Sequence, residues 1–255
     1  MKKIVCLSMF CTVWVLGFGQ KKVHSHNDYE QARPFHLAYE QRVYEIEADV
    51  YEVNGELVVA HTKKSIDPKR TLSSLYLKPI DSLFKLYGGR VSKDPKYTFV
   101  LMIDFKTEWA TTFAVLKNTL EQYGEKFDRS RNKNAVQIVI SGNRPPDSLF
   151  HTLPKWVFFD GLPNVSYAKA DLQRVTMISD NFATYSKWKG IGELPVDDAA
   201  KLRQVVAQAH QLKKPFRFWG APDHEASWKT LLQLGADILN TDKVVECKHF
   251  LTDFK

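Results

Sequence analysis

Acidic residues on one face of a predicted strand are the first sign of chemistry in this sequence. Glu45, Glu47 and Asp49 alternate with apolar residues, so the two-residue period of a strand directs all three carboxylates to one side. Like charges at this spacing in a low-dielectric interior require a proton or a cation to neutralise them. Oxygen ligands from Glu47, Asp49 and Asp104, joined by the amide of Asn27, suit one divalent cation, Ca²⁺ or Mg²⁺, rather than Zn²⁺. Glu45 lies one pleat deeper in the predicted strand. The alternative to a metal site is an acidic strand face that is exposed to solvent.

Two histidines and a lysine near these acids are suited to proton transfer and charge stabilisation. His26 follows a short apolar run, and His61 ends a second apolar run that returns after the turn at Asn54 and Gly55. Two histidines beside a carboxylate-bound cation form a general acid/base pair near neutral pH. Lys106 stands two residues after an acid, on the same predicted strand face, where it could hold a phosphate oxygen. A solvent-facing lysine is the alternative for that residue.

The elements that would position these residues are eight predicted strands. Short β-rich runs alternate with stretches of helical spacing, such as residues 107–123 and 197–212, which is the pattern of repeated βα units. Eight such units without a Pro/Gly/Ser-rich linker predict a closed (β/α)₈ TIM barrel. The predicted strands span residues 22–24, 43–50, 97–104, 136–141, 156–159, 175–178, 216–219 and 237–240.

The carboxyl ends of the strands are where a barrel of this kind carries its reactive groups. The first three predicted strands end in residues 24–28, 45–49 and 103–106, which are all polar-rich. The longest interruption, residues 62–95, contains a helix-like stretch at 72–87 and predicts an enlarged loop on the same rim.

The first 19 residues read as a targeting segment. Lys2 and Lys3 precede the apolar run 4–16, and Gly17 and Gly19 form a small-x-small cleavage site. We therefore expect a signal peptide over residues 1–19 and a single exported domain over 20–255, periplasmic or secreted. Only one of the three cysteines, Cys247, lies outside that segment, so no intramolecular disulfide is expected.

Composition excludes several classes of protein. The 255 residues are 44% hydrophobic and 25% charged, which is ordinary for a globular chain and excludes a disordered or collagen-like one. The net charge of +7 suggests anionic partners. No basic run is interleaved with aromatic residues, so a nucleic-acid partner is not expected. The densest cationic stretch, Lys63 to Arg70, is typical of a solvated loop, and no feature indicates an obligate protein partner.

Several of these motifs together resemble the superfamily of glycerophosphodiester phosphodiesterases and phosphatidylinositol-specific phospholipases C. The similar segments are residues 25–29, 47–50, 55–61 and 103–106. Within the superfamily the chain is most similar to the branch of altered-inheritance-of-mitochondria proteins, which share the His-x-His-Asn-Asp-Tyr opening and a segment like residues 70–76.

The resemblance implies a TIM barrel and a role for each matching residue. It implies that His26 and His61 are the acid/base histidines and that Glu47, Asp49 and Asp104 bind the cation. It also implies that Asn27 is a further ligand, as in eukaryotic phospholipases C. The implied activity is metal-dependent hydrolysis of a glycerophosphodiester or phospholipid-type substrate, in which one histidine takes a proton and the other protonates the leaving alkoxide.

Three positions depart from the glycerophosphodiesterase pattern. Asn27 stands where an Arg usually follows the first histidine, Asp104 stands in place of a Glu, and Thr62 stands in place of an Asp. The departures bear on the identity of the substrate more than on phosphodiester chemistry. His24 and Asn27 match the His-x-x-Asn spacing of the related sphingomyelinases D. Either His24 or His26 could therefore be the first of the two catalytic histidines. We favour His26, in which case His24 either contacts the phosphate or supports the site from behind the residues that line it.

Two further residues are candidates for substrate contact, and two other functions remain open. Arg144, beyond the fourth predicted strand, could reach a phosphate, and a solvated loop arginine is the alternative. Trp219 could form an apolar wall for an alcohol or lipid group, which would suit peripheral membrane contact, and core packing is the alternative. The His-x-His opening also matches amidohydrolase-like metal hydrolases, but the later predicted strand ends lack their histidines. A non-catalytic lipid- or glycan-binding barrel is the other alternative.

Overall fold

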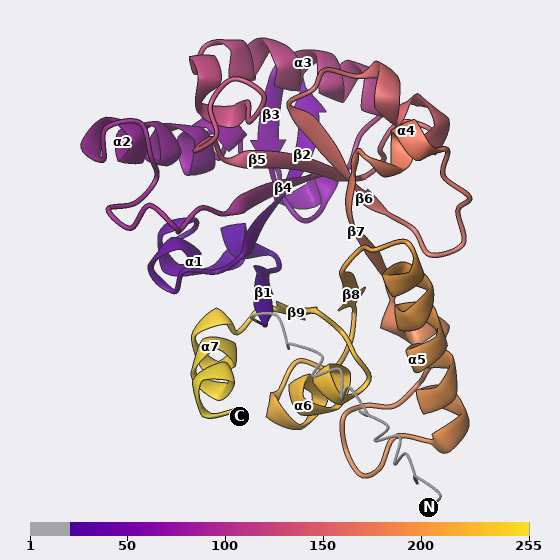
Figure 1. The fold of residues 1–255 in the computed structure, drawn as a ribbon. Helices are drawn as coiled ribbons and strands as arrows, with labels where there is room; N and C mark the ends of the chain where they lie inside the picture. Colours follow the sequence, from indigo (N-terminus) through magenta and orange to yellow (C-terminus); the bar gives the residue numbers. More distant parts are fainter. Residues whose placement is uncertain (1–20, 255) are drawn as a thin grey trace, which may run out of the picture.

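A single closed sheet forms the centre of the molecule, seen in this computed structural model, which describes residues 21–254 (Figure 1). Eight parallel strands close into a barrel because β1 pairs with both β9 and β2. The predicted TIM barrel is confirmed, and each predicted strand is present. The strands are β1 (Lys22–Ser25), β2 (Glu45–Val53), β3 (Glu56–Val59), β4 (Val100–Phe105), β5 (Gln137–Gly142), β6 (Val157–Gly161), β7 (Val175–Asn181), β8 (Phe216–Trp219) and β9 (Ile238–Thr241).

The ninth strand, β3, lies outside the parallel ring. It pairs antiparallel with β2, with Val50 opposite Val59 and Val53 opposite Glu56. The turn between them contains Asn54 and Gly55, both at positive φ, which suits a tight hairpin. The hairpin predicted before His61 is therefore present.

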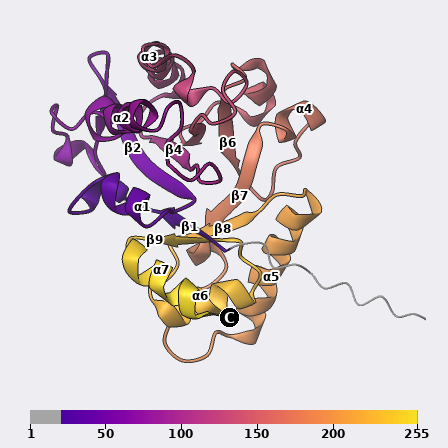
Figure 2. The same cartoon turned by 60° about the vertical axis from the view of Figure 1, so that its left-hand side comes forward.

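Helices surround the barrel unevenly (Figures 1 and 2). The structure confirms both predicted crossover helices, as α3 and α5. The β5–β6 and β6–β7 crossovers contain little helix: the first carries the short helix η5 (Asp147–Thr152), and the second carries one turn, α4. The helices are α1 (His36–Glu40), α2 (Lys78–Leu86), α3 (Trp109–Glu121), α4 (Lys169–Leu172), α5 (Val196–Gln211), α6 (Glu225–Gln233) and α7 (Val244–Asp253). Among residues 21–254, no helix is long and apolar enough to cross a membrane.

The segment between β3 and β4 differs in part from the expected rim loop. Its helical stretch forms the π-helical turn η3 (Ser73–Leu77) and α2, and Ile80 and Phe84 of α2 are buried in the core that covers the outside of the sheet. The segment is therefore also the crossover from β2 to β4, because apolar residues on one face of α2 bury against the barrel wall.

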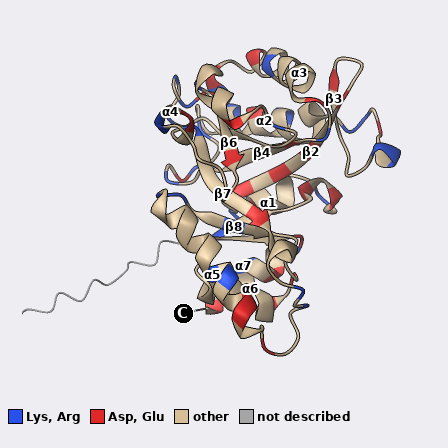
Figure 3. Ribbon diagram, turned by 90° about the vertical axis from the view of Figure 1, so that its right-hand side faces the viewer, with Lys and Arg blue, Asp and Glu red and all other residues tan. Residues whose placement is uncertain are grey.

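The inside of the barrel is apolar at one end, apart from Glu45, and charged toward the carboxyl ends of the strands. Register places Glu45 beside Val100, Glu47 beside Met102 and Asp49 beside Asp104, all pointing inward. The apolar end is a separate buried cluster formed by Val100, Met102, Val139, Met177 and Ile238. Figure 3 shows the acidic residues of β2 as red bands on that strand.

Candidate active site

A cavity of about 580 Å³ opens at the carboxyl ends of the strands. It collects nearly all the residues predicted to carry chemistry, which come from β1, β2, β4, β5 and β8 and the segments that follow them. The predicted residues that line it are His26, Asn27, Glu47, Asp49, His61, Asp104, Lys106, Arg144 and Trp219.

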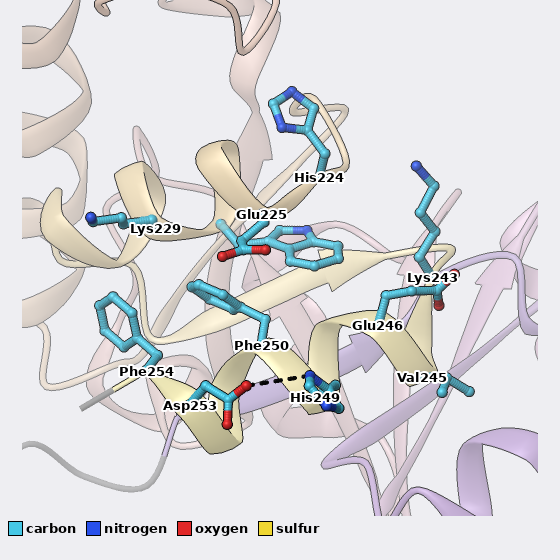
Figure 4. Close-up of a pocket in the computed structure, with 11 residues that line it drawn as sticks. His224, Glu225, Lys229, Lys243, Val245, Glu246, His249, Phe250, Asp253 and Phe254 are labelled. Atoms are coloured by element: carbon cyan, nitrogen blue, oxygen red, sulfur yellow. Dashed lines mark ion pairs between the residues drawn. The ribbon is translucent and has the colours of Figure 1, made fainter.

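A wider groove of about 960 Å³ lies on the outer wall between α6 and α7 (Figure 4). It holds two histidines, His224 and His249, and the latter faces Asp253. Within the described part of the chain, the one cluster of three metal-ligating side chains is in the mouth of the barrel and not in this groove. We therefore take the mouth cavity as the candidate active site.

Three carboxylates meet in the mouth cavity. Oxygen atoms of Glu47, Asp49 and Asp104 all lie within 4.8 Å of one another. Parallel pairing of β2 with β4 sets Asp49 directly beside Asp104. The neighbouring Gly142, at φ +67°, leaves room for this arrangement, because a Cβ there would lie 2.5 Å from Asp104 Oδ1.

The electrostatics of this cluster fit a divalent cation. Burial, together with the charges of Glu47 and Asp104, raises the pKa of Asp49 to about 6, so the carboxylates repel one another in the protein alone. Lys106 offsets part of that charge, with Nζ 2.9 Å from Asp49 Oδ2 and 2.8 Å from Asp104 Oδ1. An all-oxygen donor set of this charge suits Ca²⁺ or Mg²⁺, so the residues present fit the expected group.

Beneath the cavity, His24 contacts three charged partners: Glu45, Glu47 and Arg217. Its Nδ1 is 2.7 Å from Glu45 Oε2, and Nη1 of Arg217 is 2.7 Å from its Nε2. His24 is fully buried and does not line the cavity. The structure gives no support to a contact of His24 with the phosphate. It instead fits the alternative of a supporting residue, because Nε2 of His24 also lies 3.1 Å from Oε2 of the proposed cation ligand Glu47. Glu45 is the buried partner of this histidine.

Arg217 is the charged centre of the barrel interior, and sequence reasoning missed it. It pairs with Asp160 of β6, with Nη2 2.9 Å from Oδ2, and its Nη1 donates to Asn240 of β9 at 3.2 Å. Burial alone would raise the pKa of Glu47, but His24, His26 and Arg217 together hold it well below its usual range. An arginine between Phe216 and Phe218 in an apolar strand was the available signal.

His26 faces the cavity with a carboxylate behind it. Its Nδ1 lies 2.7 Å from Oδ1 of Asp242, which follows β9. Burial alone would lower the pKa of His26, but the hydrogen bond to Asp242 and the charges of Glu47 and Asp242 raise it above its usual value. Sequence reasoning also missed Asp242, although a polar residue directly after the last predicted strand was a usable signal.

His61 reaches the cavity from the end of the β2–β3 hairpin. Its side chain is 58% exposed, and its Nδ1 lies 3.6 Å from Asp49 Oδ2. The hydroxyl of Tyr29 lies between the acidic and histidine groups and also contacts Asn27. The motif His-Asn-Asp-Tyr thus brings a tyrosine into the site, which the sequence interpretation did not use.

The two predicted substrate contacts lie at the wall of the cavity. Arg144 is mostly buried, and its Nη2 lies 3.4 Å from Asp147. Trp219, at the end of β8, is 41% exposed. Both positions are compatible with contact to a bound molecule, and that contact stays a prediction.

Comparison with known proteins gives matches over most of the chain. The family described as "AIM6-like phosphodiesterase domain" matches residues 17–160, and the "Glycerophosphoryl diester phosphodiesterase family" matches residues 215–244. Altered inheritance of mitochondria protein 6 of Lachancea thermotolerans is 29% identical over 89% of this chain and 65% of its own length. The homolog from Arthroderma benhamiae is 24% identical over 89% of this chain and 83% of its own length. The chain thus spans just under two thirds of the first of these relatives.

Solved structures share the fold at low sequence identity. A glycerophosphodiester phosphodiesterase from Parabacteroides distasonis has a TM-score of 0.55 at 15% identity, covering 91% of this chain and 97% of that chain. A phosphodiesterase from Oleispira antarctica, in complex with the product sn-glycerol-3-phosphate, has a TM-score of 0.54 at 13% identity, covering 91% of this chain and 96% of that chain.

Proposed function

Because the chain belongs to the family of AIM6-like phosphodiesterase domains, we propose that it hydrolyses a phosphodiester with the help of one divalent cation. The observation that carries the proposal is the meeting of three carboxylates, two histidines and a lysine in one cavity. The glycerol-3-phosphate product held by the similar Oleispira antarctica phosphodiesterase supports a small phosphodiester substrate.

Glu47, Asp49 and Asp104 would hold the cation, and Asn27 adjoins them. When bound, a divalent cation polarises a phosphoryl oxygen and stabilises the charge that develops on phosphorus. Lys106, beside Asp104, brings a second positive charge to the same place.

The two histidines divide the proton transfers. Asp242 engages Nδ1 of His26, which leaves Nε2 for the reacting groups. The Nδ1 of His61 faces Asp49 and Tyr29, which leaves its Nε2 in the same way. One histidine takes the proton of the attacking water or substrate hydroxyl, and the other protonates the leaving alkoxide.

The walls of the cavity favour a substrate with an apolar or alcohol portion. Trp219 and Leu162 line the cavity with 41% and 39% of their surface exposed. We propose a glycerophosphodiester or phospholipid-type substrate, because a phosphate beside the cation would leave its organic group against these side chains.

Export is a separate proposal that rests on the sequence. The predicted signal peptide, residues 1–19, lies outside the described residues. Mass spectrometry of the protein recovered from periplasm or culture medium tests it, and a chain that begins at Gln20 is expected. Retention of Met1 in a cytosolic fraction would contradict export.

The test of the activity is hydrolysis of bis(p-nitrophenyl) phosphate, glycerophosphodiesters, lysophospholipids and phosphatidylinositol, with Ca²⁺, Mg²⁺ or EDTA. We expect turnover that EDTA abolishes and that His26→Ala removes. His249→Ala is the matched control, because this histidine is on the outer face of α7, with 81% of its side chain exposed. Cation binding without turnover on any substrate would instead favour a non-catalytic binding barrel.

A further inference from the structure

Tyr29 is buried directly behind three residues that line the candidate active site, and is only 1% exposed. Its hydroxyl oxygen lies 2.8 Å from Asp49 Oδ2, 2.9 Å from Asn27 Oδ1 and 3.3 Å from His61 Nδ1. One phenol therefore joins a proposed cation ligand, a neighbouring amide and a proposed acid/base histidine.

The single hydrogen of the phenol decides the direction of these contacts. A carboxylate and an amide oxygen can only accept, so the hydroxyl donates toward Asp49 and Asn27. With its hydrogen used there, the phenol oxygen is left to accept from His61. The Nδ1 of His61 must then carry a hydrogen, and the negative charge of Asp49, 3.6 Å away, favours the same arrangement.

From these contacts we propose that Tyr29 is a positioning residue, which fixes His61 in the tautomer with hydrogen on Nδ1 and so keeps Nε2 free to accept a proton in the cavity. The inference rests on the proposed function, since it explains why Nε2 of His61 is free to accept a proton in that reaction. The hydrogen bond made by one ring nitrogen of a histidine determines which form the other nitrogen takes.

The segment that carries Tyr29 is held in place from several sides. The neighbouring Asp28 accepts hydrogen bonds from Ser25 Oγ at 2.9 Å, from the Phe35 amide at 2.6 Å and from the Tyr76 hydroxyl at 3.0 Å. Arg70 donates to the backbone carbonyl of Tyr29. Both Arg70 and Tyr76 belong to the segment between β3 and β4, so that segment anchors the motif as well as crossing the barrel wall.

The test compares Tyr29→Phe with Tyr76→Phe in the full chain. The two tyrosines are matched, because each is buried and each donates to an aspartate. Tyr76 contacts none of the proposed cation ligands or catalytic histidines, and Asp28 keeps its hydrogen bonds from Ser25 and Phe35 when the hydroxyl of Tyr76 is removed. Long-range ¹H–¹⁵N spectra of histidine-labelled protein in EDTA at pH 8 report which ring nitrogen of His61 carries hydrogen. His61→Gln identifies its signals.

We expect hydrogen on Nδ1 of His61 in the wild type and in Tyr76→Phe, and a shift of the population toward hydrogen on Nε2 in Tyr29→Phe. The same tautomer in Tyr29→Phe as in the wild type would overturn the inference, as would a wild-type His61 with hydrogen on Nε2. Equal melting temperatures of the two variants exclude a difference in folding as the cause.

Kinetics provide the second readout. With phosphodiester turnover established, we expect kcat to fall about 10- to 100-fold in Tyr29→Phe with little change in KM, and to stay near the wild-type value in Tyr76→Phe. Equal kcat in both variants contradicts the role of Tyr29. A failure of the proposed function is recognised separately, because then no protein turns over any substrate while the spectra still report the tautomer.

Discussion

The ammonium of Lys106 lies 2.8 Å from Oδ1 of Asp104, and it bridges from there to Asp49 at 2.9 Å. The lysine therefore contacts two of the three carboxylates that are proposed to bind the cation. Its charge holds these acids together, and burial, which would lower the pKa of Lys106, is outweighed by the charges of Asp104 and Asp49, which raise it well above its usual value.

Lys106→Met should lower the stability of the cation-free protein and raise its affinity for the cation. The methionine removes the charge that compensates Asp49 and Asp104, so the melting temperature in EDTA should fall. It also removes a competitor for the same oxygens, so the dissociation constant for Ca²⁺ or Mg²⁺ should fall by about tenfold, or ~1.4 kcal/mol. Titration calorimetry measures the change. Lys85→Met, which removes an exposed ion pair with Asp81 on α2, is the control, and unchanged or weaker binding in Lys106→Met would contradict the expectation.

Glu47→Gln should abolish the stabilisation of the protein by divalent cations. The glutamine keeps the shape of the side chain but removes one negative ligand, so cation affinity should fall by at least about tenfold. The measurement is the melting temperature with and without Ca²⁺ or Mg²⁺. Glu56→Gln, an exposed position on the neighbouring strand β3, should keep the full cation-dependent increase. An equal increase in both variants would remove Glu47 from the cation site.

Asp242→Asn should reduce turnover while leaving cation binding intact. Oδ1 of the aspartate lies 2.7 Å from Nδ1 of His26. The neutral amide of an asparagine would stabilise the protonated imidazole less and would hold the ring less firmly in its orientation. We expect kcat to fall about tenfold or more, with KM and the cation dissociation constant little changed. Asp253→Asn breaks a comparable pair with His249 on the outer face of α7, at 3.5 Å (Figure 4), and should have no effect.

The thiol of Cys247 should be unreactive in the folded protein. Burial raises its pKa to about 12, because a low-dielectric surrounding disfavours the charged thiolate. At pH 8 the thiolate fraction is therefore very small, and it grows only as the pH approaches 12. In a chain that begins at Gln20, where Cys247 is the sole cysteine, a disulfide reagent such as DTNB should react slowly at pH 8 and rapidly in urea. Rapid reaction of the folded protein would show that the thiol is accessible.

The features that the sequence could predict are those that depend on neighbours along the chain. The alternation of Glu45, Glu47 and Asp49 with apolar residues predicts a strand face because adjacent side chains of a strand point in opposite directions. The turn residues Asn54 and Gly55 likewise predict a hairpin, with His61 at its end. Each of these groups lies where the local pattern directs it.

The features that could not be predicted depend on pairs of residues far apart in the chain. Arg217 meets His24 across the barrel, 193 positions away, and Asp242 meets His26 across 216 positions. No local period encodes such a contact, because it arises only when β9 closes the barrel against β1. The sequence left two roles open for His24 for this reason, and its partners Glu45, Glu47 and Arg217 hold it below the cavity, as the supporting role requires.

The antiparallel strand β3 has a consequence for how the candidate active site would respond to motion. Ala60 N donates to the carbonyl of Asp49 at 3.2 Å, which continues the β2–β3 ladder almost to His61. A proposed base and two proposed cation ligands are thus carried by one hairpin rather than by independent strands. When the barrel flexes, these three groups should move as one body, and the variable distances should be those to His26, Asp104 and Lys106, which other strands and the segments after them supply.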